Sequence, residues 1–66
     1  MGISLQRARE EGRELFRPSE VAQMGGYSEA FIYRLIKTGQ LEHVRTNDTV
    51  RIPFAAVERL LTEGLN

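Results

Sequence analysis

The sequence predicts a small α+β domain, mainly helical, and three observations support this fold class. Apolar residues recur at helical spacing in several segments, glycine-containing turns separate these segments, and one stretch near residue 50 changes to a period of two. With 66 residues, of which 41% are hydrophobic and 27% charged, the chain has room for one domain. Such a chain buries only about 60% of the surface that its unfolded form exposes. A large enzyme cleft is therefore excluded, and we expect function on the outer surface.

Composition narrows the classes of function further. Without cysteine and with one histidine, the chain has no disulfide framework and too few ligands for zinc, so we expect no metal and no cofactor. No apolar run approaches the roughly 20 residues that cross a bilayer, and no signal pattern opens the chain, so a cytoplasmic location without a membrane partner is expected. Nine basic residues balance nine acidic ones. Any site for a polyanion must therefore be local.

Residues 1–17 are predicted to be an N-terminal arm or a marginal helix ahead of a domain that spans residues 18–66. Apolar residues from Leu5 to Phe16 form a sparse helical stripe, which Gly12 interrupts at about 1 kcal/mol relative to alanine. Three arginines of this segment share one helical face near several glutamates: Arg9, Arg13 and Arg17. We favour a solvated helix or a frayed arm over an arm that contacts DNA.

A short helix is expected to begin at Pro18, which suits a first helical turn because its missing N–H would be unpaired there. Glu20 adds negative charge near the positive end of the helix dipole. The pair Gly25-Gly26 is expected to end the helix in a tight turn after about two turns of helix.

The next helix is predicted to start after Ser28, a good N-cap, and to run to about Thr38, with Gly39 as its stop. Its residues divide into two faces at 100° per residue. The core face comprises Phe31, Ile32, Leu35 and Ile36. The outer face comprises Ala30, Tyr33, Arg34 and Lys37. One face is therefore expected to pack and the other to be free for binding.

Between Val44 and Ile52 the period is two, which predicts a β-hairpin with its turn at residues 47–48. A last helix is then predicted from Phe54 to about Glu63, and Gly64 ends it.

The register of the hairpin can be predicted from the need for an apolar side. A two-residue loop would place Arg45 opposite Val50 and mix charged and apolar residues on each face. We therefore expect a loop of about three residues, which pairs Val44 with Val50 or Ile52 on the buried side. Arg45 and Arg51 would then project together from the exposed side.

Two short helices joined by a glycine-containing turn, followed by a hairpin, are typical of a winged helix-turn-helix that binds double-stranded DNA. The second helix would enter the major groove, and the hairpin would be a wing beside the DNA backbone. The predicted DNA-binding residues are Ser28, Ala30, Tyr33, Arg34, Lys37, Arg45, Asn47, Thr49 and Arg51. Since His43 is the only histidine and Asp48 fits a turn, we expect no catalytic residue.

The stretch "PSEVAQMGGYSEAFIYRLIKTGQLEHVRTNDTVRIPFAAVERLL" resembles the MerR-like winged-helix domain of phage and plasmid excisionases. Features that match include the Glu20-Val21-Ala22 start, Ile32-Tyr33-Arg34-Leu35-Ile36, and Arg51-Ile52 before the last helix. The resemblance implies a DNA-binding protein without catalytic activity that acts beside an integrase. Such excisionases bind adjacent sites cooperatively with neighbouring protomers, bend DNA and direct recombination towards excision.

Three residues depart from the pattern of the family. Gly25 stands where an apolar residue is usual, and Glu29 and Phe31 replace residues that are more often basic or small and polar. Together with the zero net charge, they predict a low intrinsic affinity for DNA. Two alternatives remain open: a small winged-helix transcriptional regulator, and a protein-interaction module that never touches DNA.

Overall fold

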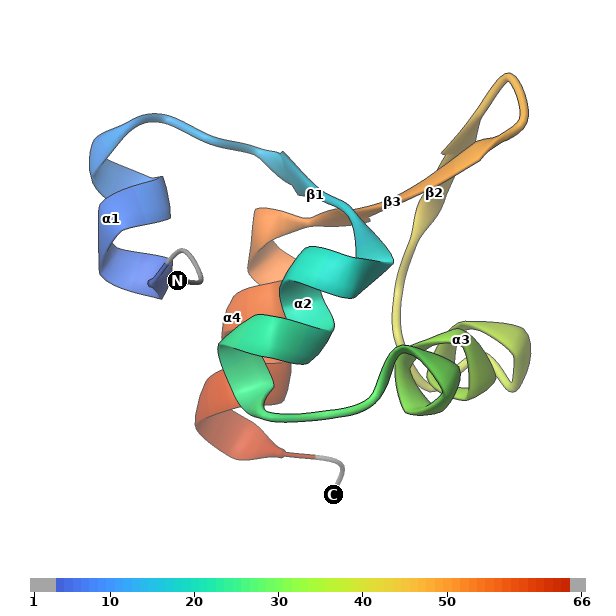
Figure 1. The fold of residues 1–66 in the computed structure, drawn as a ribbon. Helices are drawn as coiled ribbons and strands as arrows, with labels where there is room; N and C mark the ends of the chain where they lie inside the picture. Colours follow the sequence, from blue (N-terminus) through green and yellow to red (C-terminus); the bar gives the residue numbers. More distant parts are fainter. Residues whose placement is uncertain (1–3, 65–66) are drawn as a thin grey trace.

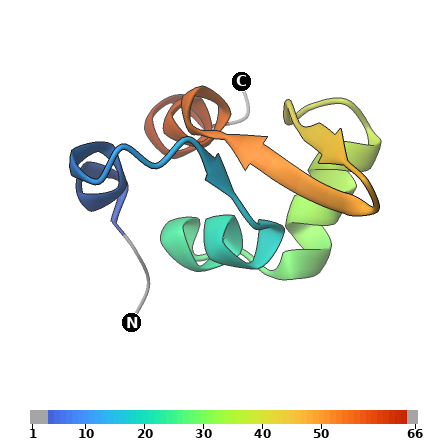
Figure 2. The same ribbon diagram turned by 90° about the horizontal axis from the view of Figure 1, so that it is seen from above.

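The computed structural model describes residues 4–64. Their helices and strands follow one another in the order α1 (Leu5–Glu10), β1 (Leu15–Phe16), α2 (Pro18–Gly25), α3 (Glu29–Lys37), β2 (Val44–Thr46), β3 (Thr49–Pro53) and α4 (Phe54–Glu63). The strands form an antiparallel sheet in the order β1-β3-β2. Figure 1 shows the β2–β3 hairpin rising beside α3, and Figure 2 shows α1 at the opposite end of the molecule. The predicted α+β class and winged helix-turn-helix architecture are confirmed.

The three helices of the domain lie where the sequence predicts them. Helix α2 begins at Pro18, and Gly26 ends it in the left-handed conformation at φ 74°. The backbone N–H of Tyr27 donates to the carbonyl of Ala22 at 2.8 Å, which closes the turn towards α3. Helix α4 ends at Glu63, as expected.

Strand β1 corrects the expectation that Leu15 and Phe16 continue a helical stripe. The helix α1 ends at Glu10, and Gly12, at φ 70°, turns the chain away from the helix. Leu15 then pairs with Pro53 and Phe16 with Ile52. Because side chains alternate across a strand, Phe16 is fully buried while Leu15 is 42% exposed. The partner strand lies more than 30 residues away in sequence, so local periodicity could not indicate it.

The hairpin has a two-residue loop, and the expected three-residue loop is wrong. Val44 pairs with Arg51, Arg45 with Val50, and Thr46 with Thr49. The side-chain argument for the longer loop assumed a buried side, yet all three residues of β2 are exposed, with Val44 at 37%. Because β2 has no buried face, the turn determines how β2 pairs with β3.

The chemistry of the loop accounts for its length. Asn47 adopts φ 54°, a left-handed conformation that asparagine tolerates better than most residues. Across the loop, the Thr49 hydroxyl donates to the Thr46 carbonyl at 2.7 Å. These local interactions fix the two-residue turn.

One core joins the helices to the sheet. Its fully or nearly fully buried residues are Ala8, Phe16, Val21, Ala22, Ile32, Leu35, Ile36, Leu41, Ile52, Val57 and Leu60. Residues from every helix and from β1 and β3 contribute to this core, so α3 and the base of the hairpin are held rigidly relative to each other.

Gly25 has a packing role that explains its departure from the family pattern. A Cβ atom built at Gly25 would lie 2.7 Å from Cδ2 of Tyr27 and 3.0 Å from Cδ2 of Leu61. The ring of Tyr27 therefore occupies the space that a side chain would need. The same ring lies 5.1 Å from that of Phe31, which sits at the edge of the core as expected.

Two arginines of the N-terminal segment tie it to the rest of the domain. Arg9 pairs with Glu58 on α4, and Arg13 pairs with Glu20 on α2. Arg9 also lies 5.4 Å from the ring centroid of Phe54. These partners belong to other elements and not to the neighbouring glutamates that the sequence suggested.

Candidate nucleic-acid interface

Helix α3 presents its outer residues in a fixed orientation because both of its ends are capped. The Ser28 hydroxyl accepts a hydrogen bond from the backbone N–H of Phe31 at 3.1 Å, as the sequence predicted. At the other end, the Thr38 hydroxyl donates to the carbonyl of Arg34 at 2.9 Å. The Ser28 hydroxyl keeps its proton and can still donate to an acceptor outside the protein.

The predicted division of α3 into two faces is confirmed. Ile32, Leu35 and Ile36 are buried, and Phe31 is partly buried. The outer face consists of exposed residues: Ala30, Tyr33, Arg34 and Lys37. Tyr33 is 50% exposed. An aromatic hydroxyl, a guanidinium and an ammonium therefore lie on one solvent-facing side of the helix.

The hairpin places its two arginines differently from the expectation. Directly opposite residues of an antiparallel pair share a face, so Arg51 lies with Val44 and Arg45 lies with Val50. Arg45 and Arg51 are therefore on opposite faces of the wing, and the prediction that they project together is wrong. Near the tip, Asn47 and Thr49 are exposed.

The distribution of ion pairs shows that positive charge is spread unevenly over the molecule, although the net charge is zero. Within residues 4–64, four of the nine basic side chains form ion pairs: Arg7, Arg9, Arg13 and Arg59. The other five form none with the carboxylates of residues 4–64: Arg17, Arg34, Lys37, Arg45 and Arg51. These five belong to the start of α2, to α3 and to the wing, whereas the four paired arginines lie on α1, in the segment after it and on α4. The free positive charge therefore gathers at one end of the molecule.

A groove of about 360 Å³ lies between the start of α2, the outer face of α3 and β3. Its two basic side chains are Arg17 and Arg51, and Tyr33 from α3 also lines it. Glu29 and Asp48 also line the groove. It thus combines residues from three separate segments of the chain.

Arg17 is the basic residue of this groove that the sequence did not assign to DNA binding. The sequence predicts that it shares a helical face with Arg9 and Arg13, but in the structure it is the N-cap of α2. An arginine directly before a proline that opens a helix is the signal that was available, because Ser, Thr, Asp or Asn is preferred at that position.

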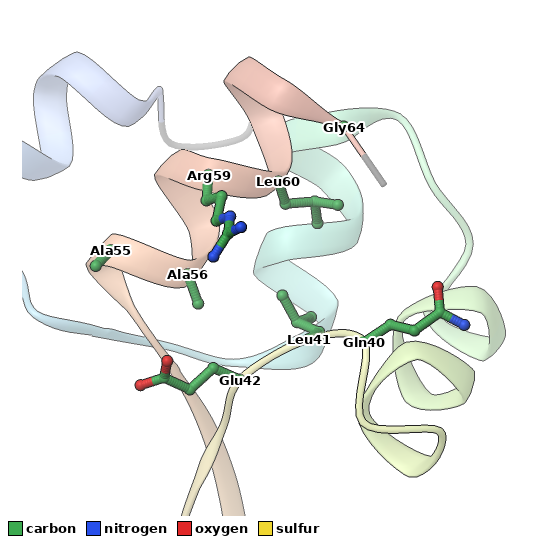
Figure 3. A pocket seen from close by; sticks show the side chains of 8 residues that line it. All are labelled: Gln40, Leu41, Glu42, Ala55, Ala56, Arg59, Leu60 and Gly64. Carbon is green, nitrogen blue, oxygen red and sulfur yellow. The ribbon is translucent and has the colours of Figure 1, made fainter. Parts of the chain in front are cut away.

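A second groove, of about 350 Å³, lies between α4 and the segment after α3. Figure 3 shows Arg59 from α4, and Gln40 and Glu42 from the segment after α3, around apolar side chains such as Leu60. Arg59 already pairs with Glu63 at 3.5 Å. This groove therefore offers no free positive charge to a polyanion.

Two further searches concern residues 4–64 alone. No group of three acidic or histidine side chains in this part of the chain is arranged to hold a metal ion. None of its helices combines the length and the apolar character that crossing a membrane requires.

Comparison with known proteins gives one match. A family described as helix-turn-helix domains matches residues 15–64, which includes β1, the three helices of the domain and the wing. No curated protein and no solved structure matches the chain.

Proposed function

The chain belongs to the helix-turn-helix domain family, and from this membership we propose that it is an excisionase-type protein that binds adjacent DNA sites cooperatively, bends the DNA and promotes integrase-mediated excision. DNA binding is the function typical of a helix-turn-helix domain. The resemblance of residues 18–61 to excisionases supports the more specific activity.

One observation carries the proposal: the five basic side chains that form no ion pair within residues 4–64 belong to the start of α2, to α3 and to the wing. An ion-paired arginine loses an interaction when it turns to a phosphate, whereas a free one does not. The end of the molecule that carries α3 and the wing is therefore the end that faces DNA. The ion pairs of Arg7 and Arg9 neutralise positive charge away from this surface.

In this proposal α3 enters the major groove. Arg34 makes bidentate contacts to guanine or to a phosphate, and Lys37 contacts the backbone as a flexible charge. Ser28 and Tyr33 donate to phosphate oxygens, and the small side chain of Ala30 lets the helix approach the bases. The wing contacts the neighbouring backbone through four residues, of which Arg45 and Arg51 reach it from opposite faces of the hairpin: Arg45, Asn47, Thr49 and Arg51.

Cooperative assembly follows from the small size of the interface. One recognition helix reads only a few base pairs, and each discriminates by about 1–3 kcal/mol. The five basic side chains that have no ion pair among the described residues 4–64 also give a limited electrostatic contribution to affinity. Contacts between neighbouring protomers on the DNA supply the missing specificity, and an asymmetric contact of this kind can continue along the groove.

Footprinting and sedimentation test the proposal together. On a duplex that carries several copies of a site selected by the protein from random sequence, protection should extend in contiguous steps and occupancy should rise steeply with concentration. The free protein should sediment as a monomer at micromolar concentration. A stable two-fold dimer that protects one palindrome without further growth would favour the transcriptional regulator. Absence of any salt-dependent shift of long duplex DNA would favour the protein-interaction module.

A further inference from the structure

We infer that Arg17 and Arg51 bind the same phosphate of the DNA backbone in the groove between α2, α3 and the wing. The hydroxyl of Tyr33 donates a hydrogen bond to that phosphate. The inference rests on the proposed DNA binding and adds to it a residue, Arg17, and a shared contact. The groove brings the two arginines together although 34 positions separate them in the sequence.

Arg17 is an unusual residue for the N-cap of α2, and its only favourable electrostatic role there is the attraction between its charge and the nearby carboxylate of Glu20. An N-cap side chain stabilises a helix by accepting hydrogen bonds, and a guanidinium has no acceptor; accordingly, the Arg17 side chain makes no capping bond. Its positive charge also lies at the positive end of the helix dipole. The start of α2 is held instead by Glu20, which accepts a hydrogen bond from the backbone N–H of Arg17 at 2.9 Å.

The two guanidinium groups are available to an anion. Neither Arg17 nor Arg51 forms an ion pair with any carboxylate of residues 4–64, although Glu29 and Asp48 line the same groove. Arg51 uses one N–H on the carbonyl of Val50 at 2.8 Å, which fixes its side chain along β3 and leaves further N–H groups to donate. Two guanidinium groups and a phenol then match the several acceptor oxygens of a phosphate.

The two carboxylates explain why the contact is limited to one phosphate. Glu29 and Asp48 repel any second phosphate that approaches the groove. The groove therefore positions the backbone at one point and contributes modestly to affinity. A groove that positions the backbone but adds little affinity agrees with the proposal that the protein depends on neighbouring protomers on the DNA.

The experiment compares neutral variants on a random-sequence duplex of about 30 base pairs over a range of salt concentrations. The variants are Arg17→Gln, Arg51→Gln and their double, and the matched control is Arg7→Gln, which removes the same charge from the exposed surface of α1. Each single groove variant should weaken binding about 5- to 10-fold at low salt. The control should change affinity less than about twofold, and thermal melting should show every variant folded.

The salt dependence distinguishes a shared phosphate from two separate ones. Each neutralised phosphate contributes about 0.9 to the slope of log affinity against log salt. When both arginines hold one phosphate, either of them still neutralises it, so the single variants keep most of the slope and the double variant lowers it by about one. A fall of about two in the double variant would overturn the inference, because it would mean two phosphates.

Two other results separate this inference from the proposed function. If the wild-type protein binds the duplex and Arg17→Gln behaves like Arg7→Gln, the inference is wrong and the proposed function remains. If the wild-type protein itself does not bind the duplex, the proposed function fails and the inference fails with it. As an independent measurement, Glu29→Gln should strengthen binding about two- to fivefold by removing the repulsion; unchanged or weaker binding would contradict the description of the groove.

Discussion

Leu35 and Arg34 are neighbours on α3 that face opposite sides, and their replacement by alanine should have opposite consequences. Leu35 is 2% exposed and belongs to the core, whereas Arg34 is exposed and forms no ion pair among residues 4–64. Leu35→Ala should therefore lower the free energy of unfolding by a large share, and Arg34→Ala should leave folding intact but weaken DNA binding.

The magnitude follows from the burial of Leu35. Alanine lacks three of its carbon atoms, and at about 0.8 kcal/mol for each buried methylene the transfer loss alone is about 2.4 kcal/mol. The cavity that remains brings the total to about 2–5 kcal/mol. A domain of this size has a free energy of unfolding of about 3–10 kcal/mol, so the loss is a large share of it. An exposed substitution such as Arg34→Ala changes stability by about 0.5 kcal/mol or less.

Urea unfolding followed by circular dichroism gives the two free energies, and a titration with fluorescent duplex DNA gives the affinities. Unfolding of Arg34→Ala with unchanged affinity in its folded fraction would refute the assignment of the two faces.

Three other changes test the wing, the start of α2 and the turn. Arg45→Ala should lower the slope of log affinity against log salt by up to about one and weaken binding on all sequences alike, since Arg45 is exposed on the wing. An unchanged slope would mean that Arg45 is a solvated surface residue that contacts no phosphate. Glu20→Gln should cost about 1 kcal/mol at neutral pH and flatten the acid limb of the stability curve measured by urea unfolding at pH 7 and pH 3.5, and two parallel curves would contradict this. Gly25→Ala should lower the melting temperature through an overlap worth about 1–3 kcal/mol with Tyr27, whereas helix propensity alone predicts a stabilised variant.

The direction of the pH effect follows from the surroundings of Glu20. Burial raises the pKa of its carboxyl, but the hydrogen bond from the backbone N–H of Arg17 and the guanidinium of Arg13 outweigh burial and hold the pKa below its usual value. A lowered pKa in the folded state means that the stabilisation is complete above the unfolded pKa of about 4.3. It is lost as the pH falls through the folded value. Glutamine at this position does not titrate, so its curve lacks that contribution.

The parts of the fold that could be predicted are those that local sequence determines. Ser28 begins α3, Gly26 ends α2, and the buried and exposed faces of α3 follow from periodicity alone. Strand β1 could not be predicted, because two residues carry too short a pattern and the pairing of Phe16 with Ile52 depends on the finished fold. The hairpin register was predicted wrongly because a rule for half-buried sheets was applied to a ribbon whose Val44 is exposed.

The candidate site shows the same division. Periodicity identified the outer face of α3, including Tyr33 and Arg34, from the sequence. Which arginines are free could not be predicted, because Arg9 pairs with Glu58 across 49 positions. The role that we infer for Arg17 likewise depends on a groove built from three separate segments.

Strand β3 belongs to two environments at once. Its end at Ile52 is fully buried and paired with β1, while its start at Thr49 stands in the exposed wing. Opening of the wing therefore breaks few apolar contacts, and the amides near Thr49 should exchange with solvent far faster than the amide of Ile52. The tip of the hairpin is therefore more flexible than its base. It can follow changes in the width of a DNA groove while the base of β3 keeps its place in the core.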